Sequence, residues 1–144
     1  MKDHGYAHRD LKPENIAVAA DYSLKIIDWG FATPYQSGLV HNTRLGTLSY
    51  MAPEIYKGSS YDAHLIDMFA IGVILFVSIV GRYPWHEPRS SDDYFGYFTR
   101  GQPSQFWAKW SRKLANENVH IDPELIDLLN GLFTTDLSQR LTVE

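Results

Sequence analysis

The stretch His8-Arg9-Asp10-Leu11-Lys12-Pro13-Glu14-Asn15 decides how this sequence of 144 residues is interpreted. Two shorter stretches follow it along the chain, Asp28-Trp29-Gly30 and Ala52-Pro53-Glu54. In the first stretch a carboxylate, an ammonium and an amide stand at positions i, i+2 and i+5. Side chains at that spacing can converge on one point from a short extended loop, but they cannot share one face of a helix.

Four side chains match the needs of phosphoryl transfer. Moving a γ-phosphoryl group to a hydroxyl requires a carboxylate that holds the hydroxyl, a cation beside the transferred group and oxygen ligands for Mg²⁺. Asp10 can supply the carboxylate and Lys12 the cation. Asn15 and Asp28 can supply oxygen ligands, because Mg²⁺ binds hard oxygen donors and completes its shell with phosphates and water.

The three stretches, in this order and at this spacing, resemble the catalytic loop, the metal-binding Asp-Phe-Gly motif and the Ala-Pro-Glu motif of the eukaryotic protein kinases. The resemblance runs from His8 to Arg140. Lys12 and the pair Gly46-Thr47 are similar to the serine/threonine branch, and the chain is nearest in look to the calcium/calmodulin-dependent kinase-like group. The implied fold is α+β but mainly α, the C-terminal lobe of the kinase-like fold with a short β-hairpin that carries the metal site.

The resemblance implies a role for each residue of the site. Asp10, Lys12 and Thr47 would be catalytic, with the Thr47 hydroxyl hydrogen-bonded between the other two and selecting a Ser or Thr acceptor. Asn15 and Asp28 would bind Mg²⁺, and together with Lys12 they would hold the phosphates of ATP. Two plainer interpretations stay open: Asn15 and Asp28 could be ordinary turn residues beside a hairpin, and Thr47 a solvated hydroxyl.

Further residues have implied structural roles. His8 and Trp29 resemble members of a hydrophobic spine, next to Gly30, and Trp in place of the usual Phe is the clearest departure from the family. Glu54 and Arg140 resemble a buried ion pair. Asp67 resembles the residue that binds backbone N–H groups of the catalytic loop, although it could instead cap its own helix.

Arg9 and Thr43 resemble a switch in which phosphorylation of a loop orders it against an arginine. A phosphate on Thr43 would add a charge of about −1.5 to −2 near Arg9. Thr43 could also be a plain polar loop residue. A second departure from the family favours this plainer interpretation of Thr43, because Thr33 stands where such kinases often carry Lys or Arg.

Composition narrows the classes of protein. With 44% hydrophobic and 21% charged residues, the chain is typical of about one globular domain. A net charge of −4 argues against a nucleic-acid partner, and the absence of cysteine excludes disulfides and cysteine-based metal sites. The longest apolar run, 68–81, is too short for the roughly 18 to 20 residues of a bilayer span, so we expect a buried helix and no membrane span. No secretory leader is visible at Met1, and we expect an intracellular, cytoplasmic location.

Local patterns predict the elements. Ile16–Ala19 and Leu24–Ile27 flank turn-forming residues and predict a hairpin with Asn15 at its entry and Asp28 at its exit. Residues 31–51 predict a long loop. Helices are expected over Asp67–Val80, Asp92–Arg100 and from the Asp122 cap to about Leu132. The aromatic residues of 94–110 predict helix packing rather than a platform for bases, which would need a basic surround.

We therefore expect residues 1–144 to be a partial protein kinase domain that lacks the N-terminal lobe and the helix before the catalytic loop. Such a core would be open on one side, to be covered by the missing lobe or by a partner. Two functions follow. The first is a serine/threonine protein kinase, inactive as this chain alone, that transfers the ATP γ-phosphoryl group to protein Ser or Thr. The alternative is a non-catalytic kinase-like remnant that acts as a protein-binding module; the intact Asp10, Lys12, Asn15 and Asp28 favour the first.

Overall fold

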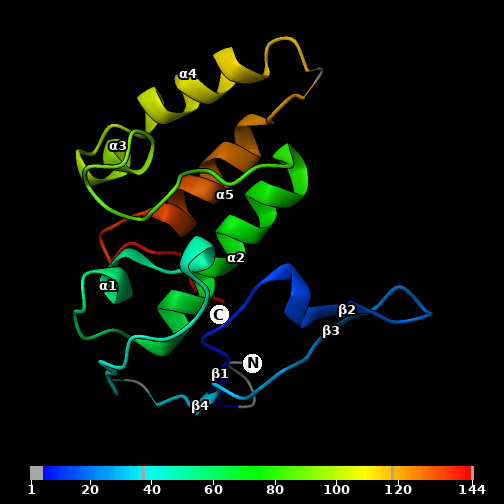
Figure 1. The fold of residues 1–144 in the computed structure, drawn as a ribbon, viewed down its shortest axis with the longest axis vertical. Coiled ribbons are helices and arrows are strands. Elements are labelled where there is room, and N and C mark those ends of the chain that lie inside the picture. The colour runs from blue at the N-terminus through cyan, green and yellow to red at the C-terminus, as the bar shows by residue number, and fades with distance from the viewer. Residues whose placement is uncertain (1–4, 37, 118, 144) are drawn as a thin grey trace.

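The computed structural model describes residues 5–36, 38–117 and 119–143 of the chain, and helices carry most of the fold (Figure 1). The strands are β1 (Tyr6–Ala7), β2 (Ile16–Val18), β3 (Leu24–Ile26) and β4 (Thr33–Pro34). The helices are η2 (Pro13–Asn15), η3 (Leu48–Tyr50), α1 (Pro53–Tyr56), α2 (Ala63–Val80), α3 (Phe95–Thr99), α4 (Pro103–Leu114) and α5 (Pro123–Phe133). In Figure 1, α2 and α5 run through the middle, α3 and α4 lie at one end, and the β2–β3 hairpin projects to one side.

The central helix α2 is longer than the sequence predicts. Asp62 caps it by accepting hydrogen bonds from the backbone N–H groups of His64 and Leu65, so the helix begins at Ala63 and not at Asp67. It ends where Gly81 adopts the left-handed conformation with φ of 72°, as expected of a C-terminal glycine. Asp67 therefore lies inside the helix, and its interpretation as an N-cap is wrong.

Helix α2 has 18 residues and, by length and composition alone, is long and apolar enough to cross a membrane. The apolar run 68–81 is shorter than this helix, because the helix begins before the run, at Ala63. Most of the helix is buried inside the protein, as in an ordinary core helix. Phe69, Val73 and Phe76 are fully buried, and Phe69 contacts Phe133 of α5 with ring centroids 5.8 Å apart.

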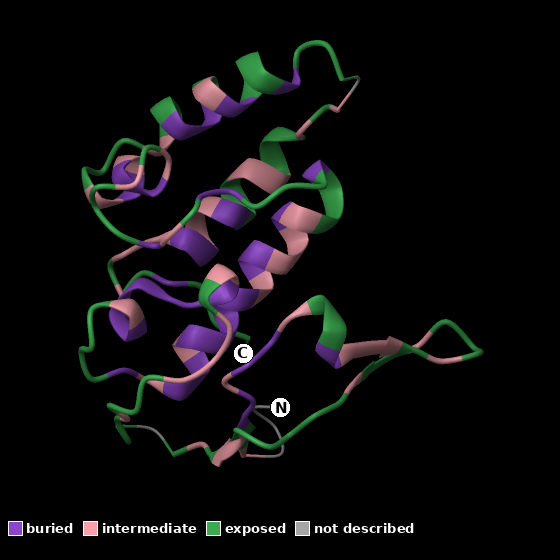
Figure 2. Cartoon of the chain, viewed as in Figure 1, coloured by how far each residue is buried: buried purple, intermediate pink, exposed green. Residues whose placement is uncertain are grey.

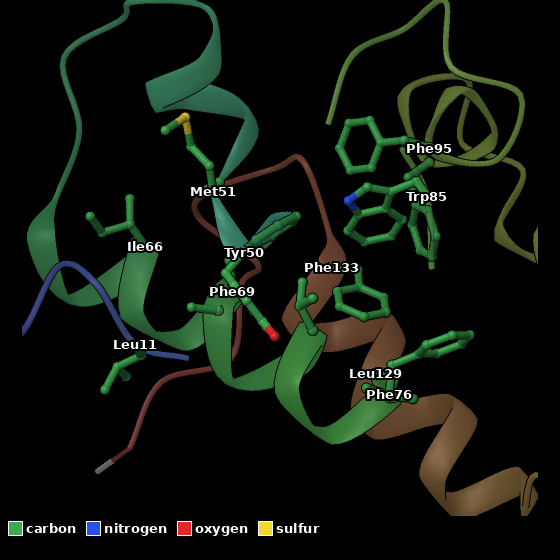
Figure 3. Packing of buried hydrophobic residues seen from close by; sticks show 14 of the residues in the cluster. Leu11, Tyr50, Met51, Ile66, Phe69, Phe76, Trp85, Phe95, Leu129 and Phe133 are labelled. Carbon is green, nitrogen blue, oxygen red and sulfur yellow. The ribbon is translucent and has the colours of Figure 1, made fainter. Parts of the chain in front are cut away.

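Aromatic side chains fill the space between α2, α3, α4 and α5 (Figure 3). Trp85 contacts Phe95 and Phe133 with ring centroids 4.9 and 4.8 Å apart. Phe95 and Phe106 have no exposed surface. The prediction that these aromatic residues serve packing is confirmed, and the burial of these large rings stabilises this end of the molecule.

Two helices at this end differ from the expectation. The predicted Asp92–Arg100 helix is only the short α3, because Asp92 uses its carboxylate to hold the turn that precedes it. Helix α4 was not predicted, although Pro103 stands at its first position and its buried face follows a helical spacing of Phe106, Trp107, Trp110 and Leu114. The α5 helix is confirmed, with Asp122 accepting from the N–H of Glu124.

The β2–β3 hairpin is confirmed. The strands pair antiparallel with Ile16 opposite Ile26 and Val18 opposite Leu24. Figure 2 shows the hairpin as a largely exposed arm, and Val18 and Leu24 are 65% and 67% exposed. The segment 31–51 is less irregular than expected, because β4 pairs with β1, His41 forms a bridge with Tyr61, and η3 lies near its end.

Candidate active site

Asp10, Lys12 and Thr47 form one hydrogen-bonded cluster. The ammonium of Lys12 donates to Oδ2 of Asp10 and to Oγ1 of Thr47, both at 2.9 Å. The Thr47 hydroxyl donates to Oδ1 of Asp10 at 2.8 Å. Asp10 is buried and Lys12 is partly exposed at the rim. The cluster therefore holds a buried carboxylate beside a cation that reaches the surface.

The charges in this cluster reinforce each other. Burial acts to raise the pKa of Asp10, but hydrogen bonds from Lys12 and Thr47 outweigh it and hold the pKa below its usual range. The hydrogen bond to Asp10 raises the pKa of Lys12, against a smaller opposing effect of burial. Both groups are charged at neutral pH, so Asp10 can accept a hydrogen bond from a hydroxyl while Lys12 attracts an anion.

Asn15 and Asp28 lie at the same end of the hairpin. The N–H of Ile27 donates to the carbonyl of Asn15 at 2.9 Å, which brings Asp28, the next residue, close to Asn15. The side-chain amide of Asn15 donates to the backbone carbonyl of Asp10 at 2.9 Å. The Asn15 amide is thereby oriented toward the Asp10–Lys12–Thr47 cluster.

These two residues fit a Mg²⁺ ion by the chemistry of their donors. Because the NH₂ group of Asn15 is used by the Asp10 carbonyl, its amide oxygen is left as an acceptor. Asp28 is exposed and adopts a positive φ of 59°, a conformation that costs about 1 kcal/mol or more for a residue other than glycine. An amide oxygen and a carboxylate that must be completed by phosphate oxygens and water match the usual ligand set of Mg²⁺. Among the described residues, no group of three or more His, Cys, Asp or Glu side chains could hold a metal ion without such partners.

Asp67 of α2 fixes the backbone of the loop that carries Asp10. Its carboxylate oxygens accept the N–H groups of His8 at 2.6 Å and Arg9 at 2.8 Å. Burial raises the pKa of Asp67 to about 6, against the opposing effect of these two hydrogen bonds. Arg9 adopts a positive φ of 67°. Gly46 packs against the backbone of Arg9: a side-chain carbon on Gly46 would lie 2.9 Å from the carbonyl oxygen of Arg9, so only glycine fits at position 46.

His8 and Trp29 hold the segment 27–30, which carries Asp28, against the loop 8–15. Nε2 of His8 donates to the carbonyl of Ile27 at 3.0 Å, and Nδ1 accepts the N–H of Asp10 at 3.3 Å, so both contacts require the same tautomer. The two aromatic rings meet edge to face with centroids 5.1 Å apart. The indole N–H of Trp29 donates to the carbonyl of Ile26 at 3.0 Å, a bond that Phe could not make. Gly30 follows with its N–H 3.4 Å from Oδ1 of Asp28.

No hydrogen bond joins Arg9 and Thr43 among the described residues. Nε of Arg9 donates to the carbonyl of Phe31 at 2.7 Å. Thr43 is exposed, and its backbone carbonyl accepts the hydroxyl of Tyr61 at 2.9 Å. The predicted switch would therefore have to bring the Thr43 side chain toward Arg9.

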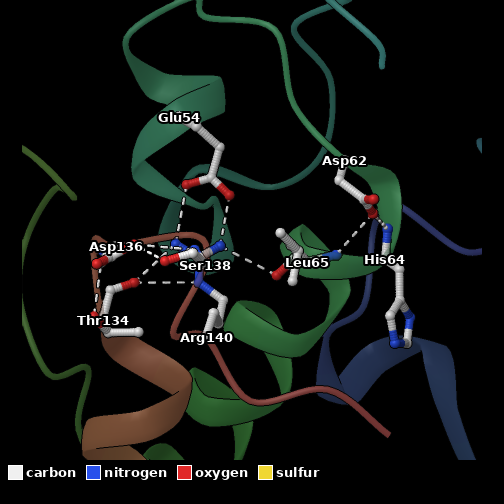
Figure 4. A network of polar contacts seen from close by, with 8 residues as sticks. All are labelled: Glu54, Asp62, His64, Leu65, Thr134, Asp136, Ser138 and Arg140. Carbon is white, nitrogen blue, oxygen red and sulfur yellow. Dashed lines mark hydrogen bonds and ion pairs between the residues drawn. The ribbon is translucent and has the colours of Figure 1, made fainter. Parts of the chain in front are cut away.

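Glu54 and Arg140 form a buried ion pair that ties α1 to the segment that follows α5 (Figure 4). One terminal guanidinium nitrogen of Arg140 donates to Oε1 of Glu54, and the other donates to Oε2 at 3.1 Å, so the contact is bidentate. Arg140 also donates to the carbonyls of Leu65 and Thr134. These carbonyl partners were not predicted, because a backbone oxygen leaves no signal in the sequence.

The chain is similar over its whole length to known proteins. The family model of the protein kinase domain matches residues 1–144. The serine/threonine-protein kinase CHK1 of Saccharomyces cerevisiae is 32% identical over 145 residues, which cover 97% of this chain and 26% of that protein. The serine/threonine-protein kinase grp of Drosophila melanogaster is 33% identical, covering 100% and 27%. The maternal embryonic leucine zipper kinase of Danio rerio is 35% identical, covering 100% and 20%. The chain thus spans about a quarter of the length of the curated relatives it matches.

Proposed function

This chain belongs to the eukaryotic serine/threonine protein kinases, and from that premise we propose that the full-length protein transfers the γ-phosphoryl group of ATP to Ser or Thr residues of proteins. The observation that carries the proposal is the cluster in which Thr47 and Lys12 both hydrogen-bond to the Asp10 carboxylate. In phosphoryl transfer most of the rate comes from positioning and from stabilising charge, and this cluster supplies both.

Each residue of the cluster has a role in the proposal. Asp10 accepts the hydrogen bond of the acceptor hydroxyl and directs it at the phosphorus. Lys12 lies beside the transferred group and balances its negative charge as a compact cation. Thr47 keeps both groups in place and borders the position of the acceptor, which favours the small hydroxyl side chains Ser and Thr.

ATP and Mg²⁺ belong to the proposal as well. Asn15 and Asp28 would hold Mg²⁺ at the open end of the hairpin, and the bound ion would neutralise charge on the phosphates. Asp67 holds the Asp10 loop through the N–H groups of His8 and Arg9, and the hydrogen bond from the Ile27 N–H to the Asn15 carbonyl keeps Asp28 near Asn15.

Regulation by phosphorylation of Thr43 is a further part of the proposal. Thr43 is exposed and so accessible to another kinase, and a phosphate would bring about −1.5 to −2 charge that Arg9 could bind. We expect the Thr43→Ala variant to lose most of its activity and active enzyme to carry phosphate on Thr43. Full activity in that variant would contradict this regulation.

The exposed apolar side chains favour one alternative. Val18, Tyr22 and Leu24 are exposed, and a contiguous apolar surface is typical of a protein interface. The full-length protein could accordingly be a non-catalytic binding module. Either function would be expected in an intracellular, cytoplasmic protein.

An assay of phosphoryl transfer distinguishes the kinase from the binding module. The full-length protein is incubated with radiolabelled ATP, Mg²⁺ and three peptides that differ only in a Ser, Thr or Tyr acceptor, with the Asp28→Ala variant as the blank. We expect label in the Ser and Thr peptides, and none above the blank for Tyr. We also expect residues 1–144 alone to be inactive. The absence of label above the blank in the full-length protein would favour the binding module.

A further inference from the structure

A pocket of about 700 Å³ lies between the segment 83–94 and helix α4. Tyr83, Trp85 and Tyr94 line it from the segment, and Trp110 and Lys113 line it from α4. None of the roles proposed for Asp10, Lys12, Thr47, Asn15 and Asp28 involves this pocket. Helix α4 forms one wall, so the pocket depends on an element that lies outside the candidate active site (Figure 1).

The walls of the pocket are held in place. Oδ2 of Asp92 accepts the N–H groups of His86 and Glu87, and Oδ1 accepts those of Tyr94 and Phe95, at 2.9 to 3.2 Å. Trp110 is buried and donates its indole N–H to the carbonyl of Pro84 at 3.3 Å. One carboxylate and one indole thus fix both sides, and a preformed pocket loses little entropy on binding.

The segment that forms most of the pocket is basic although the whole chain is acidic. Between Arg82 and Lys113 there are six basic and three acidic residues, so this segment carries a net charge of +3 in a chain of net charge −4. The ammonium of Lys113 lies 4.5 Å from the ring centroid of Trp110. Among the described residues no carboxylate lies within ion-pair distance of it.

Two basic and two acidic residues line the pocket, and they differ in how far their charge is already bound by other groups. Both oxygens of Asp92 accept two backbone N–H groups each, which spreads its charge into the backbone. Arg89 is bound to Glu87 at 2.8 Å. Asp93 is exposed and is the remaining opposing charge. A cationic ligand is disfavoured, because Lys113 already occupies the ring faces of Trp110 and Tyr94.

The pocket begins close to the cluster that would hold the acceptor hydroxyl. Ser49 lines it and stands two residues after Thr47, a distance of at most about 7 Å along the chain. Tyr83 also lines it and contacts Tyr50 with hydroxyl oxygens 3.3 Å apart. A peptide that crosses Thr47 can therefore reach this pocket without leaving the surface.

We propose that this pocket binds an acidic segment of a protein, held by Lys113 and by the aromatic rims of Tyr83 and Tyr94. That the protein is the one being phosphorylated rests on the proposed function. The acidic side chains pair with Lys113, and an apolar side chain between them contacts the rings.

Binding can be measured without ATP. The probes are a fluorescein-labelled peptide Gly-Glu-Glu-Phe-Glu-Glu-Gly and its counterpart with Gln at each Glu, titrated with the full-length protein in fluorescence anisotropy. We expect the acidic peptide to bind about tenfold more tightly at about 0.15 M ionic strength. Equal affinity for the two peptides, or no binding of either, would overturn the proposal.

Variants of α4 separate the pocket from a general surface charge. Lys113→Glu should weaken binding of the acidic peptide about tenfold, whereas Arg112→Glu, the same charge change on the neighbouring residue outside the pocket lining, should change it less than about twofold. Asp93→Asn should strengthen binding because it removes the opposing charge. Equal loss in Lys113→Glu and Arg112→Glu, or no gain in Asp93→Asn, would contradict a site at the pocket.

A kinetic experiment tests the substrate role of the pocket separately from the proposed kinase function. A Ser peptide is compared with the same peptide extended through a glycine linker by the acidic segment. We expect a lower KM for the extended peptide with the unmodified protein and no difference with Lys113→Glu. Transfer to both peptides with equal KM would refute the substrate role of the pocket, while binding without any transfer would refute the kinase proposal and leave the pocket assigned.

Discussion

Thr47 donates its hydroxyl hydrogen to Oδ1 of Asp10 at 2.8 Å, although 37 residues separate them in the chain. The same hydroxyl accepts the ammonium of Lys12. A single side chain thereby joins the segment 31–51 to the loop that carries Asp10. The position of that segment and the geometry of the cluster are coupled through this hydroxyl.

Removing the Thr47 hydroxyl should slow the reaction. Thr47→Val keeps the shape but loses two hydrogen bonds, and a loss of about 1 to 2 kcal/mol predicts a kcat about 5- to 30-fold lower on a Ser peptide. Thr47→Ser, which keeps the hydroxyl, serves as the matched control and should retain most of the kcat. Equal rates for the Val and Ser variants would show that the hydroxyl has no part in positioning Asp10.

Breaking the buried ion pair should destabilise the fold. Glu54→Gln leaves the Arg140 guanidinium, whose side chain has no exposed surface, without its counter-charge. The free energy of unfolding in urea should fall by about 3 to 5 kcal/mol. The control is Glu117→Gln, which breaks an exposed pair with Arg82 and should cost less than about 1 kcal/mol. Similar losses in both variants would mean that burial does not set the strength of the Glu54–Arg140 pair.

Asp67 should make stability depend on pH in a definite direction. Its folded pKa is about 6 against an ordinary value of 3.8, so the folded state binds more protons than the unfolded state between these values. Its contribution to stability is therefore full below about pH 4 and is lost as the pH rises toward 6 and beyond, by about 1 to 3 kcal/mol. The difference in unfolding free energy between the unmodified protein and Asp67→Asn should shrink over this range. A constant or growing difference would contradict burial as the dominant effect on Asp67.

The sequence predicted those parts of the fold whose signals are local. The hairpin follows from turn residues at 21–23, and α5 follows from Asp122 before Pro123. The start of α2 was missed because the cap at Asp62 precedes a stretch with polar residues such as His64, which the apolar pattern does not include. Helix α4 could not be predicted from its aromatic residues, because bulky apolar residues at this spacing also suit a packed segment without helix.

The candidate site depended on a different kind of signal. No local pattern places Thr47 beside Asp10 or Asp67 beside His8, and only the family resemblance suggested that these distant residues meet. The departures from the family could be predicted least. The Trp29 hydrogen bond to Ile26 depends on the curvature of the backbone after β3, and the link from Arg9 to Phe31 ends on a carbonyl.

The most direct test of the site is the Asp10→Asn variant of the full-length protein, measured for ATP binding and for kcat on a Ser peptide. The amide keeps the shape but loses the charge that orients the hydroxyl, so we expect ATP affinity within about twofold and a kcat lower by about two to four orders of magnitude. Asp21→Asn, at an exposed turn of the hairpin, is the control and should leave kcat unchanged. An Asp10→Asn variant that keeps its kcat would contradict the assignment of Asp10 and with it the proposed phosphoryl-transfer site.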